Sequence, residues 1–516
     1  MDPSWKVIPY SGDVLRRLLA QRPEPRALAR IEKKLHAAFF EEYFDNLSAK
    51  TILVERQYVD RDFLEDFAAY YVRCFESIGR LCSRLHFFDK AFNQDEFAAL
   101  LDGGPQAGDL EENLRASYLG FVVVKPLPQT VVGRTCLVTY PSDNGRRHFP
   151  ITRTYAANLF GVRLEVKTLA FQEQDRVAAA CATSALWSAF HGTGVLFQHR
   201  IPSPVEITQS ATAVILGESR ALPSGGLTKE QMATAIRQVG LEPTLINAAD
   251  EAVFLSTTYA YVRGRVPALL LGSLENLEDP NKPKVLGHHA IVVAGFSLGH
   301  ETAKPQGRHG LRLTASRIDK LYCHDDQVGP FARMACTRAG SKLALSTSWP
   351  DDANKRGNVF FVPQALLLPL YHKIRIPFSA ALEEVIAFDA FLAGLRKAFP
   401  SLPIPTLEWD LALAYVNDYK TAILQEHPPI GSRRATLESP MPKFIWCARG
   451  VEAGSATLDL LFDATGVELG DYCFRVVERS PFLGNIVRAL MNTPSALPVL
   501  QAERCWPILE RFSTSP

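Results

Sequence analysis

The amino-acid sequence predicts an α+β protein. Helical and strand-like patterns follow one another along all 516 residues, and no internal repeat or low-complexity tract interrupts them. Apolar residues make up 47% and charged residues 22%, which is ordinary for a globular chain and excludes a disordered or fibrous one. At about 150 residues per domain, a chain of this length is expected to form about three domains.

The composition also excludes several kinds of partner. Lys and Arg number 56 and Asp and Glu 55, so a net charge of +1 gives no electrostatic basis for binding nucleic acid. The nine cysteines contain no CxxC pair, which indicates reduced thiols rather than a disulfide framework or a zinc ribbon. The chain has neither a signal-peptide pattern nor an apolar run long enough to span a bilayer. We therefore expect a cytoplasmic protein with no membrane span, nucleic-acid partner, metal or cofactor.

Residues 1–110 are expected to form a mostly helical N-terminal region. Apolar residues recur at helical spacing between 28 and 39. Asp62, with Glu65 three residues later, has the pattern of a capping box at the start of a further helix.

Residues 111–345 are expected to form the central region, which begins with β-rich segments between 118 and 171. The last of these alternates apolar and charged residues, as a strand with one buried face does. Residues 229–240 then predict a helix, and 266–274 and 288–296 predict two apolar strands.

Residues 346–516 are expected to form an α+β C-terminal region. Helical patterns at 380–399 and 407–425 predict two helices, separated by a proline-rich segment that cannot continue a helix. Strand-like runs between 443 and 477 complete the region.

Cys181 is the first residue that suggests chemistry, because it opens the helical run 181–190. A cysteine at a helix N-terminus lies at the positive end of the helix dipole, which favours the thiolate, and the thiolate is the nucleophile. The alternative is a small buried side chain on an alanine-rich helix.

His289 is the second such residue, and it begins an apolar strand that ends at Gly295 and Phe296. A base at the start of a buried strand is held rigidly by the sheet and can face a helix N-terminus across a cleft. The alternative is that His288 and His289 are strand-edge residues with satisfied hydrogen bonds.

Together the two stretches resemble the papain-like cysteine peptidases. In that superfamily a Cys begins the central helix and a His opens a strand reading H-A-[VI]-x-x-x-G-[YF], which residues 289–296 match. The order of elements between Cys181 and His289 is similar to that of the bacterial double-glycine leader peptidases. The resemblance covers about residues 165–330, and it implies a papain-like core, a helix packed on an antiparallel sheet, within 111–345.

The resemblance also implies two further site residues. An Asn or Asp after the next strand orients the imidazole, and Asp325 is favoured for this role over Asp326. A Gln upstream of the Cys donates into the oxyanion hole together with the Cys backbone N–H, and Gln174 is favoured over Gln172. Relatives usually carry Gly or Trp directly after the Cys, where this chain has Ala182.

The expected function is therefore that of a cytoplasmic bacterial cysteine peptidase, a hydrolase that acts on a protein or peptide through a Cys181–His289–Asp325 triad. The same triad would serve a deamidase or a transglutaminase-like acyl transferase, so the reaction stays open among these. A non-catalytic papain-like scaffold or protein-interaction module is the other alternative. In either case the N- and C-terminal regions are available to bind a partner protein.

Overall fold

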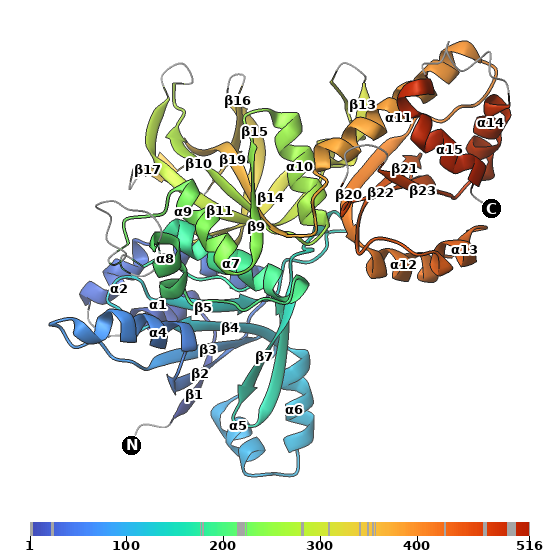
Figure 1. The fold of residues 1–516 in the computed structure, drawn as a ribbon. Coiled ribbons are helices and arrows are strands. Elements are labelled where there is room, and N and C mark those ends of the chain that lie inside the picture. Colours follow the sequence, from blue (N-terminus) through green and yellow to red (C-terminus); the bar gives the residue numbers. More distant parts are fainter. Residues whose placement is uncertain are drawn as a thin grey trace. The chain divides into compact units, whose positions relative to one another are not determined.

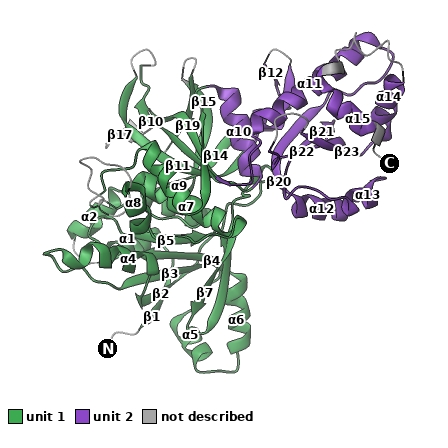
Figure 2. Cartoon of the chain, viewed as in Figure 1, with its two compact units in different colours: residues 1–249, 265–297, 320–369 green, residues 250–264, 298–319, 370–516 purple. Residues whose placement is uncertain are grey.

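The protein is described by a computed structural model (Figure 1). It describes residues 4–21, 25–175, 177, 180–213, 222, 224–279, 283–307, 310–339, 342–347, 350–352, 355–356, 358–427, 430–467, 472–492 and 502–514. The fold is α+β, with mainly antiparallel sheets. The chain divides into two compact units (Figure 2): unit 1 comprises Met1–Ala249, Arg265–Ser297 and Lys320–Pro369, and unit 2 comprises Asp250–Gly264, Leu298–Asp319 and Leu370–Pro516.

The first sheet of unit 1 is antiparallel and follows the order β1-β2-β3-β4-β5. Its strands are β1 (Trp5–Pro9), β2 (Thr51–Tyr58), β3 (Cys82–Phe88), β4 (Tyr118–Val124) and β5 (Val132–Leu137). The accompanying helices are α1 (Gly12–Ala20), α2 (Pro25–Glu32), α3 (Leu35–Asn46), α4 (Arg61–Ala69), α5 (Gln94–Leu101) and α6 (Ala107–Ala116).

This sheet corrects the predicted boundary between 110 and 111. β1, β2 and β3 lie in the region expected to be mostly helical, and β3 pairs directly with β4 on the other side of that boundary. The sheet holds an aromatic core, in which the ring of Phe44 from α3 stacks on Phe87 of β3 at 3.8 Å between centroids. Nearly every residue of β3 is buried, so its sequence lacks the alternation of apolar and polar residues that would have predicted a strand.

The second sheet of unit 1 closes on itself. β10 pairs with β11 on one side and with β19 on the other, which joins β10, β11, β14, β15, β16 and β19 into a ring. β9 pairs with β19, and β6 with β11. The strands are β6 (Arg147–His148), β9 (Leu241–Asn247), β10 (Ala268–Asn276), β11 (Lys284–Leu298), β14 (Ile318–Asp325), β15 (Gly329–Ala339), β16 (Lys342–Ser346) and β19 (Val359–Tyr371).

Two short hairpins complete the strands of unit 1. β7 (Arg153–Leu159) pairs with β8 (Val162–Thr168), whose side chains alternate between buried and exposed as predicted. β17 (Pro350–Asp352) pairs with β18 (Lys355–Arg356). Because β16 and β19 belong to the ring, unit 1 extends to Pro369, beyond the predicted boundary at 345.

Helix α7 (Cys181–Leu196) is the central helix of unit 1. It is apolar on almost every side, which is typical of a helix surrounded by protein, and Trp187 is fully buried. It contacts α8 (Pro204–Thr212), α9 (Lys229–Gln238) and β10. The predicted helix at 229–240 is confirmed as α9.

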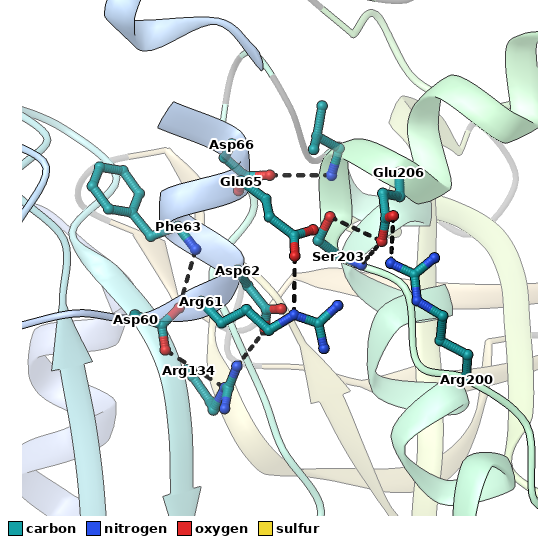
Figure 3. Close-up of polar contacts among 11 residues, drawn as sticks. Asp60, Arg61, Asp62, Phe63, Glu65, Asp66, Arg134, Arg200, Ser203 and Glu206 are labelled. Carbon is teal, nitrogen blue, oxygen red and sulfur yellow. Dashed lines mark hydrogen bonds and ion pairs between the residues drawn. The ribbon is translucent and has the colours of Figure 1, made fainter. Parts of the chain in front are cut away.

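Polar contacts fasten α4 to its neighbours (Figure 3). Asp60, and not the predicted Asp62, caps α4, because its carboxylate accepts the backbone N–H of Phe63 at 3.1 Å. Asp62 instead accepts a hydrogen bond from Arg134 of β5 at 2.7 Å. Asp66 accepts the backbone N–H of Val205 at 3.1 Å, and this bond ties α4 to the first turn of α8.

Arg134 is expected to be necessary for the stability of unit 1. Its guanidinium lies beside two buried carboxylates, 2.7 Å from Asp62 and 3.7 Å from Asp60. Arg134→Met removes the guanidinium that faces both buried carboxylates. It should lower the free energy of unfolding, measured by urea denaturation, by about 3 kcal/mol. Arg163→Met is the matched control, because its ion pair with Glu165 is exposed and should contribute little. Equal losses in the two variants would contradict the assignment.

Unit 2 contains a mixed sheet with the order β12-β13-β20-β21-β22-β23. Its strands are β12 (Pro305–Gln306), β13 (Leu311–Leu313), β20 (Glu408–Tyr415), β21 (Phe444–Glu452), β22 (Ser455–Asp463) and β23 (Cys473–Glu478). Its helices are α10 (Glu251–Arg263), α11 (Phe378–Ala398), α12 (Val416–Gln425), α13 (Arg433–Glu438), α14 (Pro481–Met491) and α15 (Trp506–Thr514).

The predicted single helix at 407–425 is wrong. Its first half is strand β20, and only its second half is helix α12. Trp409, Leu411 and Leu413 are buried at every second position, which is the period of a strand. Among the described residues, no helix combines the length and apolar character that crossing a membrane requires.

Candidate active site

Cys181 is the first residue of α7, as predicted. Its side chain is partly exposed, although most residues after it on the helix are buried. The N-cap residue is Ala180, which has no polar side chain to bond the N–H groups of the first turn. These groups therefore remain available to a negative charge at this end of the helix.

His289 lies within β11, where it pairs with Gly272 of β10. The imidazole is buried, and its Nε2 lies 3.0 Å from Oδ1 of Asp325, the last residue of β14. Because a carboxylate only accepts, Nε2 carries the proton and donates it. This leaves Nδ1 as the ring nitrogen that can face the thiol. A Cβ at Gly272 would lie 2.3 Å from the carbonyl oxygen of Val362, so only glycine fits beside this pair.

The charges around His289 favour its imidazolium form. Burial alone would lower the pKa of His289, but the adjacent Asp325 carboxylate opposes it. Hydrogen bonds to Asp325 and Cys181, together with the charge of Asp326, act in the same direction, so the pKa is raised well above its usual value. A hydrogen bond between Cys181 and His289 brings the predicted nucleophile and base together.

The two residues line one cleft of about 730 Å³. Cys181 and Ala182 contribute the start of α7, and the segment from Gly225 to Met232 contributes the start of α9. The opposite wall comes from three neighbouring strands of the ring, β10, β11 and β19, through Leu271, Gly272, His288, His289, Ala290 and Gln364. Figure 1 shows where α7, α9 and β11 lie in unit 1. The pair is therefore reachable from outside.

Asp325 is held by a tight turn after β14. Its Oδ1 also accepts the backbone N–H of Gln327 at 3.1 Å, and its carbonyl accepts that of Val328 at 3.0 Å. His36 of α3 lies on the other side of the turn, where its Nε2 donates to the carbonyl oxygen of Asp326 at 3.1 Å. An element from the first sixty residues thus supports the turn that orients His289.

Asp326, the alternative to Asp325, also faces the imidazole. Its Oδ1 lies 3.7 Å from Nε2 of His289, against 3.0 Å for Asp325. Neither of its carboxylate oxygens has a hydrogen-bond partner among the described residues. Burial raises the pKa of Asp326 to about 7. The shorter contact makes Asp325 the direct partner of His289.

His289, Asp325 and Asp326 also form the one group of three potential metal ligands among the described residues, with ligand atoms within 4.8 Å of one another. The proton on Nε2 already joins His289 to Asp325, so the arrangement is complete as an acid–base pair. Cys323 and His324 are buried beside this group. The ring of His324 packs against Phe331 at 4.6 Å between centroids, and burial lowers its pKa to about 3, which indicates a role in the core.

Neither predicted oxyanion residue lies among the residues that line the cleft. Gln174 is partly exposed. Gln172 is 5% exposed, and its Nε2 has no hydrogen-bond partner among the described residues. A buried donor without an acceptor is costly unless a ligand supplies one, and this favours Gln172 over Gln174.

A pair of variants distinguishes the two glutamines. If Gln172 donates to the oxyanion, Gln172→Ala should lower kcat by about 10²–10³-fold, whereas Gln174→Ala should change it less than about threefold. Peptide cleavage followed by mass spectrometry measures both. The reverse order would restore Gln174 to the role.

The segment before Cys181 is attached to the first sheet. Phe171 and Thr135 of β5 exchange two backbone hydrogen bonds, at 2.8 and 3.0 Å. Glu173 accepts the backbone N–H of Val132 and forms an ion pair with Lys34. Because β5 and the residue before α3 hold this segment, the N-terminal part of the chain helps to position the start of α7.

Several residues of the site were not predicted from the sequence. The side chains of His36 and Gln364 come from distant parts of the chain, and no local pattern identifies them. Gly225 and Gly226 precede the capped start of α9, so a glycine pair before a capping box was the one available signal.

The chain matches no protein-family model, and a search among curated proteins finds no relative.

Proposed function

We propose that the protein is a cysteine peptidase that cleaves a peptide or protein substrate with Cys181 and His289. One observation carries the proposal: a partly exposed cysteine at a helix N-terminus is hydrogen-bonded to a buried histidine, which in turn donates to a buried aspartate. Nucleophile, base and orienting group in this order define a site for covalent acyl transfer.

The proposed reaction begins with the thiolate of Cys181 and the imidazolium of His289. The sulfur attacks the carbonyl carbon of the peptide bond, and the electron pair moves to the oxygen. In this proposal the first-turn N–H groups of α7 stabilise the oxyanion, and the Gln172 amide would join them as a second donor. When the intermediate collapses, the C–N bond breaks and His289 gives its proton to the leaving amine. An acyl-thioester on Cys181 remains.

Water then completes the cycle. Neutral His289 takes a proton from water, and the resulting hydroxide attacks the thioester carbonyl. The C–S bond breaks, the carboxylic acid leaves, and the proton on His289 restores the imidazolium beside the thiolate. If an amine replaced water, the same intermediate would yield an amide, as in an acyl transferase. The cleft, at about 730 Å³, lies within the volume range typical of ligand sites.

Selective alkylation of Cys181 tests the proposal without knowledge of the substrate. At pH 6.5 iodoacetamide should modify Cys181 at least about tenfold faster than an ordinary thiol, because His289 can take the proton of the reacting sulfur. Cys74 and Cys336 are also partly exposed and serve as internal controls. Peptide mapping by mass spectrometry gives each rate. If Cys181 reacts no faster than these two, the protein is better described as a non-catalytic scaffold.

A further inference from the structure

Two carboxylates face one imidazole in this site, although a triad uses one. Asp325 and Asp326 are consecutive residues, and both are almost completely buried. Their oxygens lie 3.0 and 3.7 Å from the same nitrogen of His289. Burying a second carboxylate beside the first is unfavourable unless it has a partner or a function.

An irregularity in β14 explains how consecutive residues reach the same ring. Side chains normally alternate between the two faces of a strand. The pairing of β14 with β15 shifts register between Cys323 and Asp325, as at a β-bulge. Such a bulge re-aims side chains near its site. Asp326 then enters the turn, where His36 holds its carbonyl oxygen.

The two carboxylates differ in what they accept. Oδ1 of Asp325 accepts the Nε2–H of His289 and the backbone N–H of Gln327. Neither oxygen of Asp326 accepts a hydrogen bond from another described residue, and its Oδ1 lies 3.7 Å from Nε2 of His289. A shift of less than an ångström would bring Oδ1 of Asp326 within hydrogen-bond distance of Nε2 of His289.

We propose that Asp326 is a second positioning residue for His289, whose carboxylate supports the imidazolium and replaces Asp325 as acceptor when that bond is lost. The proposal rests on the proposed function and deepens it. In the first role the negative charge of the Asp326 carboxylate stabilises the imidazolium form of His289. In the second role it offers His289 another acceptor, so the loss of Asp325 weakens the orientation of the ring without abolishing it.

The charges that face these groups set the expected pH dependence. His289 faces Cys181 from α7 and the two aspartates at the end of β14. Asp326 faces His289, Asp325 and Glu173. His36, which is neutral because burial lowers its pKa, contacts the backbone carbonyl of Asp326. Because burial raises the pKa of Asp326 to about 7, its charge develops near neutral pH. A nearby negative charge raises the pKa of an imidazolium. Removal of Asp326 should therefore matter little at pH 6 and most above pH 7.

The first test measures the protonation of His289 and needs no substrate. In a Cys181→Ala background with ¹³C-labelled histidine, NMR follows the His289 imidazole, assigned by its loss in His289→Gln. Asp326→Asn should lower the titration midpoint of His289 by about 0.5 unit or more. Asp326→Glu, which keeps the charge, should preserve it, as should Asp102→Asn at an exposed position. An unchanged midpoint in a folded Asp326→Asn variant would overturn the proposal.

The second test is a double-mutant cycle on kcat/KM. Asp325→Asn should lower it by about 100-fold, less than the roughly 10⁴-fold loss expected for a sole orienting carboxylate. The double variant Asp325→Asn/Asp326→Asn should lose at least about tenfold more than the product of the two single losses. A loss equal to that product would mean that Asp326 does not replace Asp325. If Cys181 proves unreactive, the proposed peptidase fails, and the NMR midpoint still decides whether Asp326 supports His289.

Discussion

Cys181→Ala should abolish peptide-bond cleavage, lowering kcat by about 10⁴-fold or more. In the proposed reaction the sulfur forms the covalent bond to substrate, and the alanine side chain has no atom that can form it. Removal of the side chain leaves His289 and Asp325 in place, so the variant should fold and still bind substrate. Cleavage of unstructured peptides, followed by mass spectrometry of the fragments, measures the loss.

Two comparisons make this result specific. Cys336→Ala removes a thiol of similar exposure outside the cleft and should retain full activity. Cys181→Ser keeps a hydroxyl but should be nearly as inactive as Cys181→Ala, because a hydroxyl is a much weaker nucleophile. Residual cleavage of more than a few per cent in Cys181→Ala would place the chemistry elsewhere.

His289→Gln should have the second-largest effect, again about 10⁴-fold in kcat. Glutamine keeps a hydrogen bond to Asp325 but cannot exchange a proton with the thiol or the leaving amine. The fast alkylation of Cys181 at pH 6.5 should disappear in this variant, because the base that takes the thiol proton is gone. His288→Gln is the matched control, because His288 also lines the cleft but is not the residue that bonds Asp325.

The pH dependence of the wild type follows from the direction of the His289 shift. A raised pKa means that the imidazolium persists above the pH at which an ordinary histidine loses its proton. Since the imidazolium protonates the leaving amine, kcat/KM should stay high through neutral pH and fall only at alkaline pH. A decline between pH 6 and 7 would show that Asp325 and Asp326 do not stabilise the cation.

The local parts of the site could be predicted from the sequence. The apolar run after Cys181 predicted a buried helix that begins at this residue, as α7 does. The apolar run after His289 predicted a buried strand, but β11 begins earlier, at Lys284, so His289 lies inside the strand and not at its start. Asp325, with Asp326 as the alternative, was predicted from the resemblance, which implies an Asn or Asp after the next strand, where a strand-like stretch ends. The alternation of apolar and charged residues in β8 also predicted a strand, and its side chains alternate between buried and exposed. In β20, by contrast, the apolar residues fitted a helical pattern over 407–425, so the strand was not predicted.

The tertiary parts of the site could not be predicted in this way. The contact of His36 with Asp326 joins residues 290 positions apart, and nothing near His36 marks it. The choice between Gln172 and Gln174 depends on which amide is buried, which spacing from Cys181 does not determine. Asp326 faces His289 because the pairing of β14 shifts register just before it. Such a shift cannot be recognised in a single sequence.

The closure of the ring by β19 determines how much chain a working fragment would need. The segment that carries the Cys and His motifs, about 165–330, includes β10 and β11 but lacks β16 and β19. Expressed separately, it would leave the backbone of β10 bare along the edge where β19 belongs, and such edges recruit other chains. Its expected fate is aggregation, and truncation experiments should therefore extend through Pro369 and retain α3.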